Sequence, residues 1–454
     1  MTPHANTNLA SQRQAGRTVV VGLGRTGLSC ARYLQSRGVA FAVTDSRSSP
    51  PESAALRQLA PQAQVSFGAF DASLLDGATQ IVVSPGVSLR EPLLVDAVKR
   101  GLPLVGDIEL FAREAKAPVV AITGTNGKST VTTLVARMAE AAGKRVLAGG
   151  NLGRPALDLL DEPVPDLYVL ELSSFQLDTT QSLRTAAATV LNVTPDHMDR
   201  YATLGDYAAS KARIFANCDA AILNLDDAAV RGMAGSARRK LGFSLLRDPA
   251  ADYYADAQGS DVVLMQGNAP IVAMSELKIT GLHNAANALA SLAMSDALGL
   301  AREHAVQALR DFPGLPHRSQ WVADVDGVRY VDDSKGTNVG ATLAAVAGMP
   351  GSLVLIAGGQ GKGQDFSALA AAFRGKVRHV VLLGQDAKRI ADAVQGVSTL
   401  EFARDMDEAV QMSAKAARPG ETVLLSPACA SLDMFRDYAH RGDVFAAAVR
   451  GLRS

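Results

Sequence analysis

The sequence predicts an α/β protein built from three domains, each organised around a largely parallel sheet. Short apolar runs rich in Val, Ile and Leu alternate with helical stretches along most of the 454 residues, which is the pattern of βαβ units. Glycine-rich turns follow several of these runs, where a strand passes into a helix. Because one hydrophobic core rarely serves so long a chain, we expect domains of about 100 to 200 residues each.

The bulk composition disfavours several classes of function. The 45 basic and 45 acidic residues give a net charge of zero, so no global basic field points to nucleic acid. The first sixteen residues are polar and no window approaches about eighteen uninterrupted apolar residues, so neither export nor a membrane span is indicated. Residues 1–16 are expected to form a disordered leader.

The three cysteines give no metal or redox signature. Cys30, Cys218 and Cys429 are isolated in the sequence, and no pair has the spacing of a metal site or a redox motif. A reduced cytoplasm is therefore the simplest setting for this protein.

The first domain is predicted over residues 17–106, as a Rossmann-like βαβ fold. Its expected strands are residues 17–21, 40–44, 80–83 and 103–105, with a helix that ends at Arg37. Gly22, Gly24 and Gly27 form a G-x-G-x-x-G motif, and the acidic Asp45 follows about twenty positions on, which is typical of dinucleotide binding.

Two interpretations of this motif stay open. By itself it favours a dehydrogenase, but a second phosphate loop later in the chain makes hydride transfer a weaker hypothesis. The physical expectation that survives is a helix N-terminus after Gly27 that accepts a diphosphate, with Asp45 placed to bind a ribose or base. The alternative is a tight turn that holds no ligand.

The second domain is predicted over residues 107–313, as a P-loop-type ATPase domain with a parallel sheet. Its start contains the most informative stretch of the chain, residues 123–130, which join an apolar run at 118–122 to an amphipathic segment at 131–142. Backbone N–H groups near Gly124 and Gly127 can approach phosphate oxygens, Lys128 can bridge phosphates, and Ser129 can bind Mg²⁺. The expected ligand is ATP.

The match to the general P-loop is incomplete. Ile122 stands where the first glycine of the usual motif belongs, so the loop is shortened to G-x-x-G-K-S. The alternative interpretation is a glycine-rich turn capped by Ser or Thr.

Polar residues follow further strands of this domain, which are expected at 145–147, 167–170, 189–192 and 220–224. Glu171 ends one apolar run and is a natural Mg²⁺ ligand, although a salt-bridged or capping Glu is possible. Asp196 and His197 follow another run, where a lone His is more often structural. We expect the phosphate loop, Glu171 and this cluster to meet at one sheet edge.

Two further features of this domain lie on predicted helices. Lys211 sits on a helix of small and apolar residues and, taken alone, is interpreted as a solvated lysine. Short β-like runs are expected between 252 and 279, before a helix at 284–297. Asn284 and Asn287 share one face of that helix and can contact adenine edges or phosphates, unless they only cap it.

The third domain is predicted as a Rossmann-like domain over residues 314–454, after the break at Pro313 and Gly314. Its expected strands are residues 328–331, 353–357, 377–383 and 422–425. Arg318 suits the charge on a transferring phosphoryl group. The segments 332–338, 358–363 and 426–433 each follow a strand and offer N–H groups or a Lys to an anion, which suggests a carboxylate-bearing substrate.

Eight segments in this order resemble the Mur ligases of peptidoglycan synthesis: ITGTNGKST (122–130), LELSSFQL (170–177), LNVTPDHMDRY (191–201), GLHNAANALA (281–290), FPGLPHR (312–318), DDSKGTN (332–338), GGQGKGQDF (358–366) and SPACASLDMF (426–435). The resemblance runs from about Val19 to the C-terminus. It implies that the three domains bind a uridine nucleotide, ATP and an amino acid, respectively. It is nearest to members that join D-glutamate to UDP-N-acetylmuramoyl-L-alanine through an acyl phosphate.

The resemblance also implies roles for individual residues. It implies catalytic roles for Lys128, His197, Lys211 and Arg318. It implies an ATP site made by Gly124, Thr125, Asn126, Gly127, Lys128, Ser129, Thr130, Asn284, Asn287, Arg318 and Asp333. It implies two Mg²⁺ sites made by Ser129, Glu171, His197 and a carbamylated Lys211 that bridges them. It implies UDP-substrate contacts from Thr26, Asp45, Arg47, Gly86 and Asn151, and a D-glutamate pocket made by Thr337, Lys362, Ser431, Leu432 and Tyr438.

Two departures from the family pattern leave local loop geometry open. Gln320 stands where an acidic residue often follows the His-Arg pair, and Gly336 replaces a common Ala. The expected protein is a monomer. The rival hypotheses are a folylpolyglutamate synthase, which lacks a uridine-binding first domain, an NAD-dependent dehydrogenase, and a nucleotide-binding module without catalysis.

Overall fold

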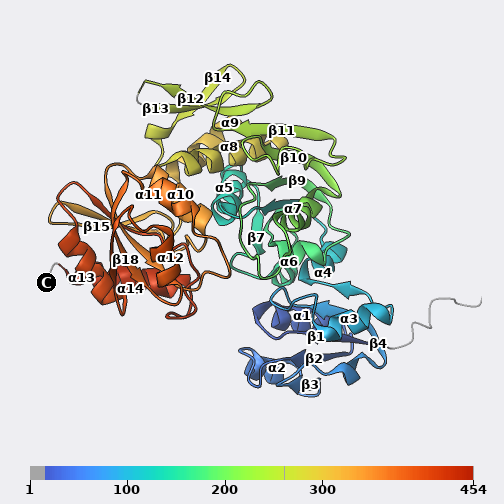
Figure 1. The fold of residues 1–454 in the computed structure, drawn as a ribbon. Coiled ribbons are helices and arrows are strands. Elements are labelled where there is room, and N and C mark those ends of the chain that lie inside the picture. Colours follow the sequence, from blue (N-terminus) through green and yellow to red (C-terminus); the bar gives the residue numbers. More distant parts are fainter. Residues whose placement is uncertain (1–15, 260, 453–454) are drawn as a thin grey trace, which may run out of the picture. The chain divides into compact units, whose positions relative to one another are not determined.

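The α/β class predicted from the sequence is confirmed by a computed structural model, which describes residues 16–259 and 261–452 (Figure 1). The described chain divides into two compact units. The first holds residues 16–119 and 147–184, and the second holds residues 120–146 and 185–452. The leader predicted at 1–16 lies outside the described residues except for Gly16. The domain divisions after 106 and after 313 stay predictions.

The first unit contains a parallel sheet with the strand order β3-β2-β1-β4-β5. Its strands are β1 (Arg17–Val21), β2 (Phe41–Asp45), β3 (Gln64–Phe67), β4 (Ala78–Val83) and β5 (Leu104–Val105). Its helices are α1 (Arg25–Ser36), α2 (Ser53–Leu59), η1 (Ala72–Leu75), α3 (Pro92–Lys99) and α4 (Asp107–Glu114). The chain order reverses between β1 and β4, and ligands of such sheets bind outside the carboxyl ends of the strands at this point.

A second part of the first unit follows the phosphate loop in the sequence. It contains β7 (Val146–Gly150), η2 (Ala156–Asp161), β8 (Leu167–Glu171) and α6 (Ser174–Asp178). Ser173 and Gln176 form a reciprocal capping box at the start of α6, which satisfies N–H groups that the first helical turn leaves without partners. The Gln176 amide also donates to Asp107 Oδ2 at 2.9 Å, so α6 is tied to the start of α4.

Asp107 is a buried carboxylic acid with one unsatisfied oxygen. Its Oδ1 has no hydrogen-bond partner among the described residues, and burial raises its pKa from 3.8 to about 6 although Gln176 opposes this shift. Because the pKa of Asp107 is higher in the folded than in the unfolded protein, its contribution to the free energy of unfolding is greatest below about pH 4. This contribution is lost as the pH rises through about 6.

We expect Asp107→Asn to abolish this pH dependence, because an amide does not ionise. The free energy of unfolding of wild type should fall by up to about 3 kcal/mol between pH 4 and pH 7 through this group, whereas that of the variant should not. Calorimetry at several pH values measures this difference in slope. The control is Asp161→Asn at an exposed position of the same unit, which should follow wild type; parallel profiles for Asp107→Asn and wild type would contradict the prediction.

The second unit contains two sheets. In the first, the strands run in the order β14-β13-β12-β11-β10-β9-β6. Neighbouring strands from β12 to β6 are parallel, whereas β12, β13 and β14 pair antiparallel. These strands are β6 (Val119–Thr123), β9 (Thr185–Val190), β10 (Cys218–Asn224), β11 (Arg239–Ser244), β12 (Tyr253–Gln258), β13 (Asp261–Gln266) and β14 (Ala269–Ala273). The accompanying helices are α5 (Lys128–Ala141), α7 (Leu204–Ala212), η3 (Arg213–Phe215), η4 (Met274–Glu276), α8 (Leu282–Ala297) and α9 (Arg302–Asp311). Helices α5, α8 and α9 pack against one another.

The second sheet of this unit has the order β15-β16-β20-β17-β18-β19, with only β15 antiparallel to its neighbour. Its strands are β15 (Gln320–Val325), β16 (Val328–Asp332), β17 (Leu353–Gly358), β18 (Val377–Leu383), β19 (Thr399–Phe402) and β20 (Thr422–Leu425). Its helices are α10 (Val339–Gly348), α11 (Ala368–Phe373), α12 (Ala387–Ala393), α13 (Met406–Ala416) and α14 (Tyr438–Gly451). Separate apolar clusters cover its two faces, as expected for a sheet enclosed by helices.

The sequence analysis did not predict four of the described strands, namely β3, β11, β15 and β19. Three of them lie at sheet edges, where one side of the strand contacts solvent and polar residues are tolerated. The fourth, β11, begins with two exposed basic residues, Arg239 and Lys240. These strands lack the continuous apolar run by which buried strands are recognised.

The start of α1 also differs from the prediction. The helix begins at Arg25 rather than after Gly27. A Cβ at Gly27 would lie 2.0 Å from the carbonyl oxygen of Gly22, so this glycine permits close contact between the helix and β1. The strand expected at 189–192 likewise ends at Val190, because the following residues bind the phosphate loop.

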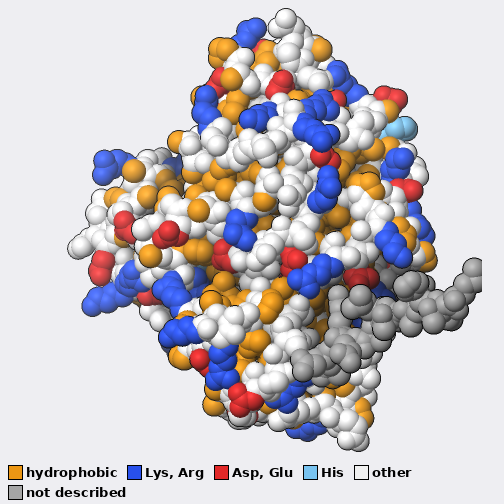
Figure 2. All heavy atoms as spheres, turned by 90° about the vertical axis from the view of Figure 1, so that its right-hand side faces the viewer, with side chains coloured by type: hydrophobic (Ala, Val, Ile, Leu, Met, Phe, Trp, Pro, Cys, Tyr) orange, Lys and Arg blue, Asp and Glu red, His pale blue; other side chains and the backbone are white. Residues whose placement is uncertain are grey.

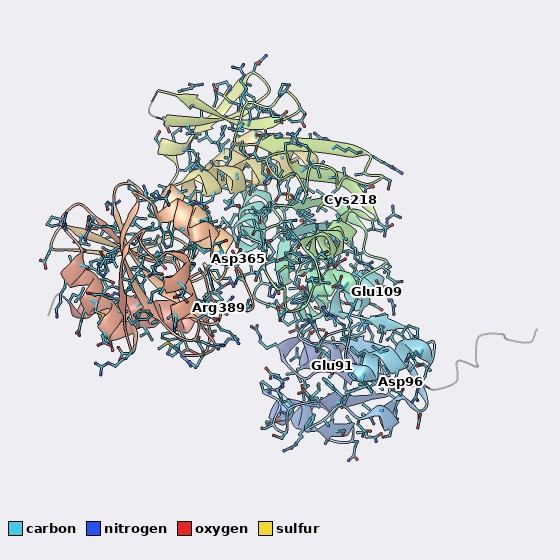
Figure 3. All side chains as sticks on the ribbon, in the orientation of Figure 1. Glu91, Asp96, Glu109, Cys218, Asp365 and Arg389 are labelled. Carbon is cyan, nitrogen blue, oxygen red and sulfur yellow. The ribbon has the colours of Figure 1, made fainter. Side chains whose placement is uncertain are left out.

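On the face shown in Figure 2, basic and acidic side chains are interspersed among uncharged ones. Cys30, Cys218 and Cys429 are buried and form no disulfide; Cys218, on β10, is labelled in Figure 3. Among the described helices, none has both the length and the apolar character needed to cross a bilayer.

Candidate functional site

The shortened loop passes between β6 and α5, where the phosphate cradle was predicted. Gly127 caps α5 in the left-handed region at φ 85°, and Gly124 has φ 146°. A Cβ on Gly127 would lie 2.4 Å from Asn287 Oδ1, and one on Gly124 would lie 3.0 Å from Leu191 Cβ. Both positions therefore require glycine, and the loop needs no further glycine at Ile122 to pass from strand to helix.

Two lysines meet on this loop. Lys128 Nζ donates to the carbonyl oxygens of Gly124 at 2.9 Å and Thr125 at 2.8 Å. Lys211 Nζ donates to the same Gly124 oxygen at 2.9 Å and lies 4.3 Å from the ring centroid of Tyr207. Lys211 is only 1% exposed, so its interpretation as a solvated lysine is wrong. Helix α7 directs the Lys211 side chain toward the phosphate loop. The small residues next to Lys211 in the sequence gave no indication of this contact.

The segment after β9 packs on the phosphate loop, as expected for two loops at one sheet edge, because β6 and β9 are neighbouring parallel strands. Thr125 N–H donates to the Asn192 carbonyl at 2.9 Å, and Asn126 N–H donates to Asn192 Oδ1 at 2.8 Å. In the same segment, the pKa of His197 is lowered to about 4, chiefly by burial and also by the ammonium groups of Lys362 and Lys128, against the opposing effect of Asp196. His197 is therefore neutral near pH 7, the form that can act as a ligand.

Glu171 ends β8 in the first unit and is 3% exposed. Its Oε1 accepts a hydrogen bond from Asn151 Nδ2 at 2.6 Å, and its backbone carbonyl accepts from Asn151 N–H at 2.8 Å. Its Oε2 is buried with no hydrogen-bond partner among the described residues. An uncompensated carboxylate oxygen of this kind is costly and suits a hard cation. In the part of the chain that the structure describes, His, Cys, Asp and Glu side chains form no group of three or more that could hold a metal.

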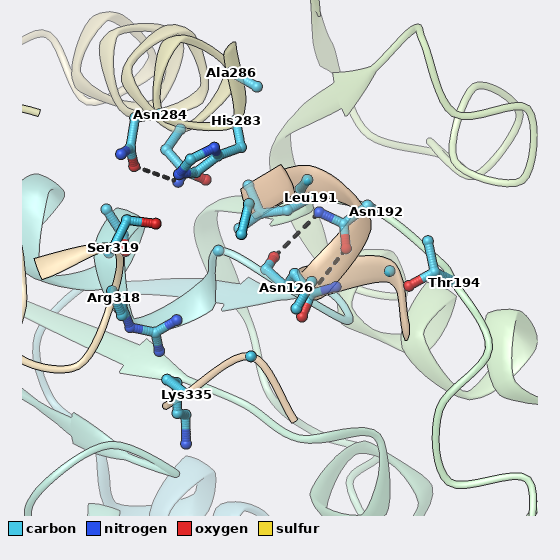
Figure 4. A pocket seen from close by; sticks show the side chains of 18 of the residues that line it. Asn126, Leu191, Asn192, Thr194, His283, Asn284, Ala286, Arg318, Ser319 and Lys335 are labelled. Carbon is cyan, nitrogen blue, oxygen red and sulfur yellow. Dashed lines mark hydrogen bonds between the residues drawn. The ribbon is translucent and has the colours of Figure 1, made fainter. Parts of the chain in front are cut away.

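A cavity of about 280 Å³ lies beside the phosphate loop in the second unit. Figure 4 shows His283 and Asn284 at the start of α8 on one side, with Arg318, Ser319 and Lys335 on another. All four residues predicted on the nucleotide side line this cavity, namely Asn284, Asn287, Arg318 and Asp333. Asn287 Nδ2 donates to Asn284 Oδ1 at 3.2 Å, which confirms that the two amides share one helical face.

Arg318 and Asp333 are two of the ionisable residues that line this cavity. Arg318 Nη2 donates to Ser129 Oγ at 2.8 Å, so the guanidinium reaches the start of α5. Asp333 accepts from Ser426 Oγ at 2.8 Å and from Ser319 N–H at 3.1 Å. Burial raises the pKa of Asp333 to about 7, although these hydrogen bonds and Arg318 oppose the shift.

Phe243, His283 and Lys335 are among the cavity-lining residues to which sequence reasoning gave no individual role. Phe243 lies on β11, a strand that was not predicted. His283 precedes Asn284 and has a buried Nδ1 with no hydrogen-bond partner among the described residues. Lys335 places its ammonium 3.7 Å from the Tyr438 ring centroid. His283 and Lys335 could have been found from the sequence, because they lie inside the motifs at 281–290 and 332–338.

The residues predicted to bind the UDP substrate lie in the first unit. Thr26 lies in the first turn of α1, and Gly86 follows β4. Asp45 is 2% exposed and accepts from Leu23 N–H at 2.6 Å and from Arg47 Nη2 at 2.6 Å. Burial alone would raise its pKa, but the Arg47 and backbone hydrogen bonds outweigh burial and lower it. Asp45 and Arg47 thus bind each other in this structure.

The loop that carries Asn151 is joined to the start of α1. Arg25 Nη2 donates to the Gly153 carbonyl at 2.8 Å, and Ser29 Oγ donates to Asp158 Oδ1 at 2.6 Å. The structure therefore brings the loop after β7 next to the glycine-rich turn after β1.

The residues predicted to bind D-glutamate follow the three central strands of the last sheet. Strands β16, β20 and β17 are adjacent and parallel, so the loops after them share one edge. Ser431 is buried, whereas Leu432 is 67% exposed, and Tyr438 is the first residue of α14. Lys362 Nζ lies 3.8 Å from Asp196 Oδ1, and Thr337 N–H donates to the Lys335 carbonyl.

The two departures from the family pattern have local partners. Gln320 Oε1 accepts from His317 N–H at 3.0 Å. A Cβ on Gly336 would lie 2.6 Å from Asp333 Oδ2 and 2.9 Å from Ser426 Oγ. The absence of a side chain at Gly336 therefore leaves room for the Asp333 to Ser426 hydrogen bond.

Comparison with known proteins gives family matches along the chain. Residues 16–106 match the family described as Mur ligase MurD-like, N-terminal domain. Residues 122–295 match the Mur ligase middle domain, and residues 317–429 match the Mur ligase, glutamate ligase domain.

Solved structures of low sequence identity share the fold. The chain aligns with UDP-N-acetylmuramate-alanine ligase MurC from Thermotoga maritima at a TM-score of 0.62 and 18% identity, covering 96% of this chain and 100% of that one. It aligns with MurF ligase from the same organism, solved in complex with ADP, at a TM-score of 0.61 and 16% identity, covering 84% and 91%.

Curated relatives are much more similar in sequence. The proteins named UDP-N-acetylmuramoylalanine--D-glutamate ligase from Nitrosococcus oceani and Methylobacillus flagellatus are 51% and 52% identical to this chain. The alignments cover 97% of this chain and 98% of the first protein, and 96% of this chain and 97% of the second. At this identity over nearly the whole length, the chain belongs to the Mur ligase family.

Proposed function

We propose that this protein is an ATP-dependent ligase that joins D-glutamate to UDP-N-acetylmuramoyl-L-alanine in peptidoglycan precursor synthesis. The observation that carries the proposal is the phosphate loop with Lys128, Lys211 and Arg318 gathered on it, in a chain about half identical to ligases of that name. A monomer in the cytoplasm is the proposed form and setting.

The proposed reaction has two steps. The alanyl carboxylate attacks the γ-phosphorus of ATP, which forms an acyl phosphate and releases ADP. The D-glutamate amine then attacks the acyl carbonyl, the tetrahedral intermediate collapses, and inorganic phosphate leaves. Both steps depend on positioning and on neutralising charge more than on a protein nucleophile.

The protein groups proposed for phosphoryl transfer are cationic. The Lys128 ammonium lies on the loop that would hold the phosphates, and the N-terminus of α5 adds its partial positive charge. Arg318 Nη2 reaches Ser129 Oγ, so its guanidinium would stand beside the same phosphates and stabilise the charge that develops during transfer.

The residues proposed for Mg²⁺ are Ser129, Glu171, His197 and Lys211 in its carbamylated form. The buried Glu171 oxygen, which has no partner among the described residues, and the neutral His197 fit a divalent cation. When bound, Mg²⁺ would neutralise phosphate charge and orient the γ-phosphoryl group. Carbamylation joins the Lys211 amine to CO₂, releases one proton, and leaves one N–H that can still donate to the Gly124 carbonyl.

We propose that the remaining candidate residues bind the substrates. Asn284, Asn287 and Asp333, which line the cavity, would contact the adenosine. Thr26, Asp45, Arg47, Gly86 and Asn151 would contact the UDP-muramoyl substrate. Thr337, Lys362, Ser431, Leu432 and Tyr438 would hold D-glutamate, with the Lys362 ammonium available to a substrate carboxylate.

The hydrogen bond from Asn151 to Glu171 leads to a specific prediction. Asn151→Ala removes the amide that orients the Glu171 carboxylate, so we expect the Mg²⁺ concentration for half-maximal activity to rise about tenfold. Magnesium titrations at saturating ATP, amino acid and UDP-muramoyl substrate measure this change. Gln58→Ala, at an exposed position of the same unit, is the control. An unchanged Mg²⁺ requirement in Asn151→Ala would show that the amide does not orient Glu171.

The proposed function is tested by release of ADP and phosphate with UDP-N-acetylmuramoyl-L-alanine and four amino acids. We expect D-glutamate to support turnover, whereas L-glutamate, L-lysine and meso-diaminopimelate should not. Absence of phosphate release with the complete set of substrates would refute the proposal. A change in nicotinamide absorbance would favour the dehydrogenase hypothesis, and activity on a folate substrate would favour the folylpolyglutamate synthase hypothesis.

A further inference from the structure

One buried side chain, Asn338, connects the phosphate loop to the loops of the last sheet. Asn338 is 2% exposed. Its Nδ2 donates to Asn126 Oδ1 at 3.1 Å, and its Oδ1 accepts from Asn126 Nδ2 at 3.3 Å. Two amides that exchange hydrogen bonds in this way hold the tip of the phosphate loop against the loop after β16.

Asn338 also contacts the segment that carries His197. Its Nδ2 donates to Asp196 Oδ2 at 3.2 Å, and Asp196 Oδ1 accepts from His197 N–H at 2.9 Å. Asp196 is 6% exposed, so its charge is compensated by the groups around it rather than by water. A Cβ on Gly340 would lie 2.9 Å from Thr194 Oγ1, which shows how closely the start of α10 approaches this segment.

On its other side, Asn338 is held by the last sheet. Its Oδ1 accepts from Ala341 N–H at 2.8 Å and caps α10. The next residue, Val339, donates its N–H to Gln364 Oε1 at 2.9 Å, and Gln364 Nε2 donates to the Gly361 carbonyl at 2.9 Å. The loop that carries Lys362 is therefore connected to the phosphate loop through Gln364, Val339 and Asn338.

We infer that Asn338 is a positioning residue that couples occupancy of the phosphate loop to binding of the amino acid, an inference that rests on the proposed function. The phosphate loop and the Lys362 loop adopt their present arrangement together because residues 338–339 hydrogen-bond toward both, the Asn338 side chain to Asn126 and the Val339 N–H to Gln364. A nucleotide that orders the first loop therefore favours the arrangement that binds D-glutamate. By linkage, D-glutamate tightens nucleotide binding by the same factor.

The test uses Asn338→Ser in the full-length protein. A serine hydroxyl still caps α10, but it is too short to donate to Asn126 and Asp196. We expect the KM for D-glutamate to rise about tenfold at saturating ATP and UDP-N-acetylmuramoyl-L-alanine, with kcat changed by less than about threefold. Asp405→Ser is the matched control, because Asp405 likewise caps a helix beside the last sheet, α13, and is exposed.

Calorimetric titration with a non-hydrolysable ATP analogue supplies a readout other than turnover. In wild type, saturating D-glutamate in the presence of the UDP substrate should tighten analogue binding at least about fivefold. In Asn338→Ser this factor should fall to near one, while the affinity measured without D-glutamate stays close to that of wild type. A purely structural role would lower the melting temperature and leave this factor unchanged.

A second variant separates coupling from capping. Asn338→Asp keeps the cap, but it replaces the donor with a carboxylate oxygen next to Asp196, so its KM for D-glutamate should exceed that of Asn338→Ser. A wild-type KM and a wild-type coupling factor in either variant would overturn the inference. If wild type itself released no ADP with D-glutamate, the proposed function would fail together with the inference. If wild type turned over normally and the Asn338 variants behaved like it, only the inference would be refuted.

Discussion

Lys128→Met is expected to lower kcat/KM for ATP about 10³-fold, because it removes the cation that would lie against the transferring phosphoryl group. Methionine keeps the apolar stem of the side chain, so the change is confined to the ammonium and its hydrogen bonds to Gly124 and Thr125. Initial rates of ADP release at varied ATP measure the loss.

Two comparisons make this prediction specific to phosphoryl transfer. Lys144→Met, at an exposed lysine soon after the end of α5, should retain wild-type rates. If Lys128 served only to hold nucleotide, as in a non-catalytic module, the variant would bind the ATP analogue more weakly yet recover full kcat at high ATP. That outcome would contradict a role in the transition state.

Lys211→Met is expected to lower kcat about 10³-fold, because methionine cannot capture CO₂ and cannot supply an anionic oxygen to Mg²⁺. The side chain is buried and its Nζ contacts the Gly124 carbonyl, so the variant loses a group at the proposed phosphate site. Turnover at saturating substrates measures the loss, and Lys240→Met, at an exposed lysine of β11, is the control.

A spectroscopic measurement tests carbamylation directly. Wild type equilibrated with ¹³C-bicarbonate should give one carbamate signal in the carbon NMR spectrum, and Lys211→Met should not give it. Activity should also fall in buffer depleted of CO₂ and return when bicarbonate is added. Retention of more than about a tenth of wild-type kcat by Lys211→Met would be incompatible with the ligand role.

The strands and loops of the candidate site were largely predictable because their signals are local. The run before Gly124 is apolar, the loop contains the glycines that its backbone needs, and α5 begins at Lys128. The same holds for β16, β17 and β20, whose polar loops follow continuous buried runs. Because neighbouring residues determine such strand to loop to helix units, the sequence pattern is enough to locate them.

The partners of individual side chains were not predictable in the same way. Lys211 appeared solvated from its neighbours on α7, although it contacts Gly124, which is 87 residues away in the sequence. Asn338 gave no signal beyond its place in a loop motif, although it contacts Asn126, which is 212 residues away. The edge strands β3, β15 and β19 likewise depend on neighbours in the sheet rather than on their own apolar content.

The sequence by itself determined the α/β class, the position of the phosphate loop and the strand ends where polar residues gather. Only the tertiary structure decided that Lys128 and Lys211 share one carbonyl, that Asp45 pairs with Arg47, and that Asn338 bridges two loops. The physical reason is that backbone conformation follows from local sterics and periodicity, whereas burial and long-range hydrogen bonds depend on which strands become neighbours.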